Sequence, residues 1–332
     1  MQCTKAARPL RRRTGGDILG SMTTLLYQHD AFTRHIVPEG HPERPDRMRA
    51  TREALSDAAF DSLDRREPPL AEASVAELAH PASYIESILD SAPAKGLSNL
   101  DPDTWMSPGS VEAALRAVGG SNAAVDAVMA GEAVNAFCDH RPPGHHAEKT
   151  RAMGFCLFST AAIAARHAIR AHGLERVAVV DFDVHHGNGT QDVVEDDPAI
   201  FYASSHEGGI FPGTGHASET GVGNIVNVPL RGGSGSAAFH AAYERTILPA
   251  LDEFAPQLVI VSAGFDAHRD DPLASLQLET ADFAWITDRL CEAAATHCDR
   301  KLVSLLEGGY DLAALGASTA AHVSSLMTAA KG

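Results

Sequence analysis

The sequence predicts a single-domain α/β protein with a central, mostly parallel, doubly wound β-sheet flanked by helices. Short apolar runs rich in β-branched residues, which are typical of buried strands, alternate along the chain with longer segments of helical composition. This alternation favours a parallel sheet covered by helices. No change of composition and no internal repeat divides residues 22–332, so we expect them to form one domain.

Strands are expected where a short apolar run leads into polar or glycine-rich sequence. The clearest is Val-Ala-Val-Val at 177–180, because β-branched residues pack well in a buried sheet. The complete set of expected strands is 25–27, 133–137, 177–180, 199–204, 225–228, 258–262 and 301–306.

Helices are expected between these strands. Residues 110–129 are rich in alanine, which has the highest helix propensity. The other expected helices are 48–55, 75–78, 81–89 with Pro81 in its first turn, 158–171, 237–254 and 281–296. Residues 67–71 should form a loop or a short strand. Residues 91–109 hold three prolines and two glycines and should form a long surface loop, a kind of segment that is often functional.

The composition is that of a soluble globular protein, with 44% hydrophobic and 21% charged residues. A net charge of −16 argues against a general nucleic-acid binder and is compatible with a cationic substrate or partner. No apolar run reaches the roughly 18 to 20 residues that span a bilayer. Five scattered cysteines without a Cys-x-x-Cys pattern favour a reducing, cytoplasmic location.

Residues 1–21 contain four arginines but no apolar core after them, as a secretory signal would require. We therefore expect a disordered N-terminal tail, with Met22 as a candidate start.

Polar clusters follow four of the expected strands at their carboxyl ends. They are the segments 139–146, 181–190, 264–268 and 307–310. In open α/β sheets this edge is where ligands bind. Four separate segments therefore predict one site.

The segment after residue 180 predicts a metal site. Alternate side chains of an extended chain share a face, so Asp181, Asp183 and His185 should point the same way. Burying such groups is costly without a compensating positive charge. Asp183, His185 and Asp266 supply the three protein ligands of a catalytic zinc site with an open position, and Fe²⁺ or Co²⁺ would also be held. A hydrogen-bonded cluster at a strand end is the simpler alternative.

Proton transfer is expected from His145 and His146, which follow Pro-Pro-Gly. We predict that His146 is the general base for the attacking water and that His145 is its electrostatic partner or an acid. Asp181 and Asn188 are the available groups to orient the two rings.

Tyr310 follows two glycines, which permit close backbone approach. Its hydroxyl could donate to an oxygen that becomes negative during amide hydrolysis, although a tyrosine is more often part of a core or a surface. Phe155, which follows Gly154, and Phe211 could wall a narrow apolar channel or simply pack in the core. In the long loop, Asp101 or Asp103 could hold a substrate amide or cation, although solvated carboxylates are the default there.

Most of these residues lie in five ordered motifs. The motifs are Arg-Pro-Pro-Gly-His-His at 141–146, Asp-Phe-Asp-Val-His-His-Gly-Asn-Gly-Thr at 181–190, Phe-Pro-Gly-Thr-Gly at 211–215, Gly-Phe-Asp-Ala-His at 264–268 and Glu-Gly-Gly-Tyr at 307–310. Together they resemble the zinc-dependent histone deacetylase superfamily, and the resemblance covers nearly the whole chain. Asn188 and its surroundings are similar to the class II branch and its bacterial amidohydrolase-like members.

The resemblance implies an arginase-like fold and the removal of acetyl or other acyl groups from acylated amines such as N6-acetyl-lysine. It implies zinc at Asp183, His185 and Asp266, and it gives His145, His146 and Tyr310 the roles described above. It adds a structural K⁺ site formed by Asp181, Asp183, His185 and Ser204, and it makes Phe155 and Phe211 the walls of the acyl-lysine tunnel.

Substrate choice stays open at this stage. Polyamine-selective relatives carry Glu at the position of Leu273, so leucine favours acyl-lysine or another acylated amine without excluding acetylpolyamines. A binuclear manganese ureohydrolase would share the fold, but His268 stands where its second metal would need a carboxylate. A non-catalytic binding protein for acylated ligands is the third alternative. The sequence also leaves a homo-oligomer open.

Overall fold

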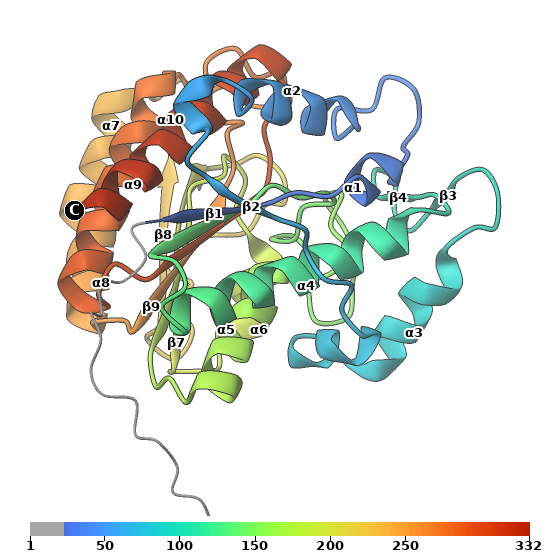
Figure 1. The fold of residues 1–332 in the computed structure, drawn as a ribbon, viewed down its shortest axis with the longest axis horizontal. Coiled ribbons are helices and arrows are strands. Elements are labelled where there is room, and N and C mark those ends of the chain that lie inside the picture. Colours follow the sequence, from blue (N-terminus) through green and yellow to red (C-terminus); the bar gives the residue numbers. More distant parts are fainter. Residues whose placement is uncertain (1–22) are drawn as a thin grey trace, which may run out of the picture.

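The computed structural model describes residues 23–332, and the expected N-terminal tail lies outside this range. Its centre is an eight-stranded sheet in the order β2-β1-β5-β10-β9-β6-β7-β8, in which every neighbouring pair is parallel (Figure 1). The strands are β1 (Thr24–Tyr27), β2 (Asp64–Arg66), β5 (Asn135–Cys138), β6 (Val177–Asp181), β7 (Ile200–Glu207), β8 (Ile225–Leu230), β9 (Leu258–Ala263) and β10 (Leu302–Leu306). The predicted fold class is confirmed.

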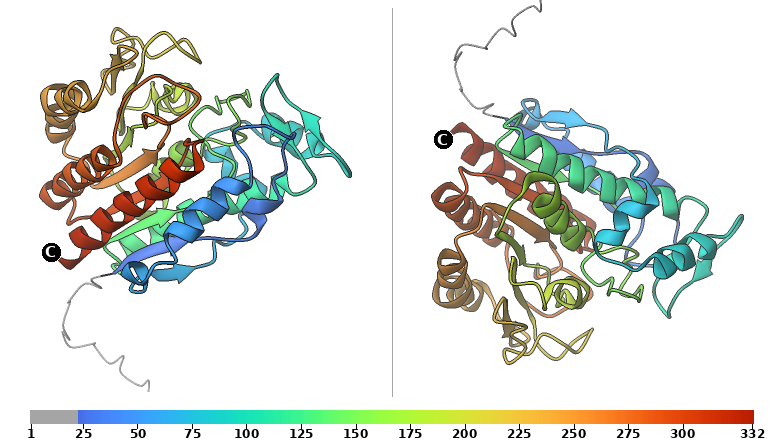
Figure 2. Two further views of the ribbon diagram at one scale, coloured as in Figure 1. Left: turned by 90° about the horizontal axis from the view of Figure 1, so that it is seen from above. Right: turned by 90° about the horizontal axis from the view of Figure 1, so that it is seen from below.

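Helices cover both faces of the sheet, with α2, α9 and α10 over one face and α4 and α5 over the other (Figure 2). The helices are α1 (Ala31–Arg34), α2 (Asp46–Ala54), α3 (Ala82–Ser91), α4 (Ser110–Met129), α5 (Thr160–His172), α6 (Asn188–Val194), α7 (Ser236–Ala242), α8 (Leu248–Phe254), α9 (Thr280–His297) and α10 (Leu312–Lys331). Two short 3₁₀ segments occupy Ala58–Phe60 and Ala73–Leu78.

Two hydrophobic cores follow from this layering. Successive side chains of a strand point to opposite faces, so Val179 packs in the core under α4 and α5, whereas Val180 packs in the core under α9 and α10. Strands buried on both faces have continuous apolar sequences, which is why residues 177–180 predicted a strand so clearly.

Several details differ from the prediction. Helices α1, α6 and α10 were not expected, and three other segments are arranged differently. Residues 91–109 contain a small antiparallel pair, β3 (Ser98–Asn99) and β4 (Trp105–Met106), which is too short to leave a periodic signal. Strand β2 begins at Asp64, before the expected 67–71 segment. The sequence did not reveal it, because this charged edge strand has no apolar pattern. The expected helix at 237–254 contains a π-turn at Tyr243–Ile247 between α7 and α8. Pro249, which follows at the start of α8, has no N–H to continue a regular α ladder.

Within residues 23–332, no helix is both long and apolar enough to cross a membrane.

Candidate active site

Because the strands are parallel, their carboxyl ends meet at one edge of the sheet. Strand β6 ends at Asp181, immediately before Asp183 and His185, and β9 ends three residues before Asp266. One donor atom from each of Asp183, His185 and Asp266 lies within 4.8 Å of the other two. His185 Nδ1 is 3.2 Å from Asp183 Oδ1 and 3.0 Å from Asp266 Oδ2.

The backbone holds these carboxylates in place. The N–H of Gly308 donates to Asp183 Oδ2 at 2.8 Å, and the N–H of Val184 donates to Asp266 Oδ1 at 2.8 Å. A Cβ atom on Gly308 would overlap the carboxylates of both aspartates, so this position requires glycine. The backbone around Gly308 and Val184 therefore accommodates two converging carboxylates.

The donor set fits a divalent cation. Burial first, and then the negative charge of Asp183, raise the pKa of Asp266 to about 7, so the surroundings disfavour a second negative charge at this point. A divalent cation would remove this repulsion, and two carboxylates with one imidazole are ligands that zinc and related metals accept. The side chains of Asp183 and Asp266 are buried from solvent, and His185 is 8% exposed.

The histidine pair lies beside this cluster, with its ring centroids 4.0 Å apart. His145 Nδ1 is 3.0 Å from Asp181 Oδ2, and His146 Nδ1 is 2.8 Å from Asn188 Oδ1. The Asn188 amide nitrogen donates to Glu148 at 2.7 Å, so its oxygen faces His146 and accepts from Nδ1–H. The Nε2 atom of a neutral His146 is then free to accept a proton.

The two imidazoles have opposite electrostatic environments. Burial and the positive charge of His145 hold the pKa of His146 well below its usual value. Burial also lowers the pKa of His145, but nearby carboxylates, Asp183 foremost, outweigh it and hold that pKa well above its usual value. Environments that separate the pKa values of adjacent groups are typical of acid–base pairs.

Tyr310 follows β10 and is 7% exposed. Its backbone N–H donates to Asp271 Oδ2 at 2.7 Å, and the guanidinium carbon of Arg47 lies 5.1 Å from its ring centroid. Burial and the charge of Asp266 raise the pKa of the phenol well above its usual value. Tyr310 therefore keeps its proton and can act as a hydrogen-bond donor.

A cavity of about 250 Å³ joins these groups to the surface. Phe155 and Phe211 face it, and the Phe155 ring lies 5.8 Å from that of Tyr310. Gly154 has a φ of +55°, and a Cβ there would overlap the His146 imidazole. The lining residues are Pro42, Asp103, His146, Gly154, Phe155, His185, Phe211, Leu273 and Tyr310.

The family model of the histone deacetylase domain matches residues 41–326 of this chain. The chain belongs to the histone deacetylase family. Members of this family are deacetylases and amidohydrolases, enzymes that hydrolyse amides, and as a family they depend on a metal ion.

Individual relatives agree with this assignment. The chain is 42% identical to a histone deacetylase-like amidohydrolase of Pseudomonas aeruginosa, over 82% of this chain and 73% of the relative. It is 35% identical to the human polyamine deacetylase HDAC10, over 92% of this chain and 48% of the relative. The crystal structure of the HDA15 HD domain superposes with a TM-score of 0.87 at 34% identity, covering 92% of this chain and 90% of that one.

Other residues singled out in the sequence lie near these groups or in the loops around the cavity. Ser204 on β7 is the register partner of Asp181, and its Oγ bonds to His206 Nδ1 at 2.9 Å. Asp103 faces the cavity, whereas Asp101 does not. Asp101 Oδ1 instead accepts the N–H groups of Asp103 and Thr104 at 3.0 and 2.7 Å and so holds the turn.

Two buried carboxylates were missed by sequence reasoning. Glu307 Oε2 accepts the backbone N–H groups of Gly144 and His145 at 2.7 and 3.1 Å, which ties the histidine loop to the end of β10. Asp271 ties Tyr310 to the segment that follows Asp266. The available signals were the Glu-Gly-Gly-Tyr motif for Glu307 and the Asp-Asp-Pro sequence for Asp271. Pro42, in the segment before α2, and Arg47, on α2, were likewise not assigned to the site.

Proposed function

We propose that this chain is a metal-dependent hydrolase that removes acetyl or other acyl groups from acylated amines such as N6-acetyl-lysine. The observation that carries the proposal is a single cavity lined by His146, His185 and Tyr310 together with Phe155 and Phe211. Its volume of about 250 Å³ is below the roughly 300 to 1,000 Å³ of ordinary small-molecule pockets, which suits one extended side chain.

Asp183, His185 and Asp266 would hold the catalytic ion, for which we propose Zn²⁺, with Fe²⁺ or Co²⁺ as accepted substitutes. When bound, such an ion would polarise the substrate carbonyl and make water more acidic. We also propose a structural K⁺ ion near Asp181, Asp183, His185 and Ser204, bound partly through backbone oxygens.

The remaining side chains move protons and stabilise charge. Neutral His146 accepts a proton from the attacking water at Nε2, while protonated His145 stabilises the negative charge nearby. Tyr310 donates its O–H to the carbonyl oxygen as that atom becomes negative. The carbon–nitrogen bond then breaks, and the departing amine takes a proton from the histidine pair, leaving a carboxylic acid and a free amine.

Acetylpolyamines are the second candidate substrates. Asp103 lines the cavity, and although burial and the adjacent Asp101 raise its pKa to about 6, it stays mostly charged at neutral pH and could attract a distal ammonium. The human relative carries the name polyamine deacetylase. Leu273 adds an uncharged side chain to the same cavity, which favours acyl-lysine over a polycation.

A binuclear ureohydrolase and a binding protein without turnover receive less support. Among residues 23–332, the group of Asp183, His185 and Asp266 is the only buried set of three or more metal-ligand side chains, so there is no second buried set for a binuclear centre. His146 and Tyr310 are both present, which weakens the case for a protein that binds acylated ligands without hydrolysing them.

The test is turnover by the purified protein on acetyl-lysine peptides, acetylpolyamines, arginine and agmatine, with and without a chelator. We expect hydrolysis of acetylated amines that the chelator abolishes. His146→Ala and Tyr310→Phe should each lower kcat by about 100-fold or more.

A matched control is Tyr84→Phe. It removes a buried phenol oxygen that bonds to Leu157 O at 2.7 Å, away from the cavity, so it should keep normal kcat. Chelator-resistant activity, or near-normal rates in both site variants, would contradict the proposal. Hydrolysis of arginine or agmatine would favour the ureohydrolase, and ligand binding without turnover would favour the binding protein.

A further inference from the structure

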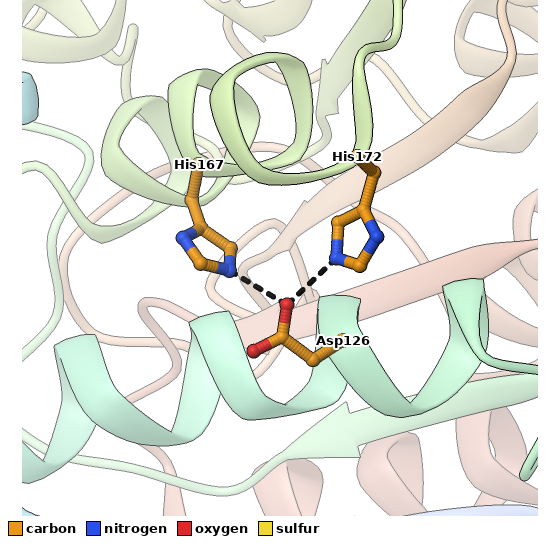
Figure 3. Close-up of side chains that lie close together, drawn as sticks. All are labelled: Asp126, His167 and His172. Atoms are coloured by element: carbon orange, nitrogen blue, oxygen red, sulfur yellow. Dashed lines mark hydrogen bonds and ion pairs between the residues drawn. The ribbon is translucent and has the colours of Figure 1, made fainter. Parts of the chain in front are cut away.

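A second group of potential metal ligands lies far from the deacetylase site. It consists of Asp126 on α4 and of His167 and His172 on α5, two helices that pack side by side (Figure 3). Asp126 lies three residues before the end of α4, and His172 is the last residue of α5. These helix ends lead into β5 and β6, so the group lies near the amino ends of strands whose carboxyl ends carry the catalytic residues.

The three side chains converge on one point. Nε2 of His167 and Nε2 of His172 are each 2.7 Å from the same oxygen, Oδ1 of Asp126. Figure 3 shows both rings reaching from α5 toward this carboxylate on α4. The ring centroids are 6.1 Å apart and the ring planes are nearly perpendicular, so the two nitrogens approach the oxygen from different directions.

This arrangement is close to that of a bound metal. Zinc–nitrogen and zinc–oxygen bonds of about 2.0 to 2.2 Å place tetrahedral ligand atoms about 3.3 Å from one another. The observed separations of 2.7 Å would therefore open by about half an ångström. The side chains are 21%, 24% and 53% exposed for His167, His172 and Asp126, so small side-chain rotations can provide this shift.

We propose that Asp126, His167 and His172 form a second, surface site for a divalent transition-metal ion that cross-links α4 and α5. Two imidazoles and one carboxylate favour Zn²⁺, Ni²⁺ or Cu²⁺ over Mg²⁺ or Ca²⁺, which prefer oxygen ligands. The catalytic group has the reverse ratio, with two carboxylates and one imidazole. Three protein ligands leave a position for water on the exposed side.

Such an ion acts on stability. Consider an ion that binds only to the folded state. At a free concentration of about 100 times its dissociation constant, it shifts the folding equilibrium about 100-fold toward the folded state. The cross-link joins the helices that cover one face of the sheet, so thermal unfolding should shift upward with free ion. The proposal does not depend on the deacetylase activity, which should be unaffected.

The experiment uses the full chain with its catalytic site already loaded with Zn²⁺. Equilibrium dialysis against further Zn²⁺, followed by metal analysis, should give two equivalents per chain in the unsubstituted protein. It should give one in the double variant His167→Gln/His172→Gln. Added Zn²⁺ should raise the unfolding temperature of the first protein but not of the second.

A control is His297→Gln, which removes one imidazole from another interhelical pair, His297 Nε2 with Asp252 Oδ1 at 2.8 Å. It should keep both equivalents. If the double variant does not fold, Asp126→Asn keeps an oxygen acceptor for both rings and should weaken the second site at least tenfold. The proposal would be overturned if the unsubstituted protein bound only one equivalent. It would also be overturned if the double variant still bound the second equivalent, or if Asp126→Asn bound it with unchanged affinity.

Discussion

Replacing Gly154 by alanine tests whether this glycine exists to position His146. The residue has a φ of +55°, where an L-residue with a Cβ costs about 1 to 2 kcal/mol. The new Cβ would also overlap the His146 imidazole. That ring is confined by His145 at 4.0 Å and by Phe211 at 5.0 Å between centroids, so relief of the overlap displaces the proposed base. A misplacement of about 1 Å costs about 100-fold in rate, or about 2.7 kcal/mol in activation free energy.

Gly131→Ala separates the two effects. Gly131 has a similar φ of +73°, but nothing lies within 4 Å of a Cβ placed there. Both variants should unfold a few degrees below the unsubstituted protein, because both carry the same backbone cost. Only Gly154→Ala should lose about 100-fold in kcat on an acetyl-lysine peptide. Equal kcat in the two variants would show that the close approach to His146 has no catalytic purpose.

Three further outcomes are expected. Asp271→Asn weakens the hydrogen bond from the Tyr310 N–H, so kcat should fall about 10- to 100-fold with little change in KM. An unaltered kcat would contradict the idea that Asp271 positions Tyr310. Removal of the metal by a chelator leaves Asp183 and Asp266 in mutual repulsion, so the unfolding temperature should fall and recover with added Zn²⁺ in a calorimetric titration. Burial lowers the pKa of His322 to about 3, so below pH 6.5 the unfolded chain binds a proton that the folded chain does not. Stability should therefore fall as pH drops from 6.5 toward 3, by about 2 kcal/mol from this group at pH 5, and His322→Gln should reduce that slope in denaturant titrations.

The strands were predictable because burial on both faces leaves a continuous apolar run, as in Val177 to Val180. The location of the site was predictable because the carboxyl ends of parallel strands meet at one edge of the sheet. That edge brings together residues as far apart in sequence as His185 and Asp266. Helix α6, which starts at Asn188 within the metal-binding motif, was not predicted, because its short polar sequence carries no apolar periodicity.

The supporting contacts were beyond sequence reasoning for a physical reason. Glu307 and Asp271 act through bonds to backbone N–H groups far along the chain, and such bonds leave no periodicity and no spacing to detect. Asp101 and Asp103 are also indistinguishable in sequence. The fold decides that one carboxylate folds back onto the turn while the other faces the cavity.

The way the cavity is built separates its chemistry from its selectivity. At the end where we propose that the metal binds, the buried carboxylate of Glu307 connects the histidine loop to the end of β10 through backbone N–H groups. At the mouth, the side chains of Phe211 and Leu273 are apolar and are 41% and 38% exposed. A mutation of Leu273 can therefore reshape the entrance while the reacting groups keep their positions, whereas a mutation of Phe211 also acts on His146, against whose ring it packs. Position 273 is thus where one scaffold could change its substrate during evolution and retain a single reaction.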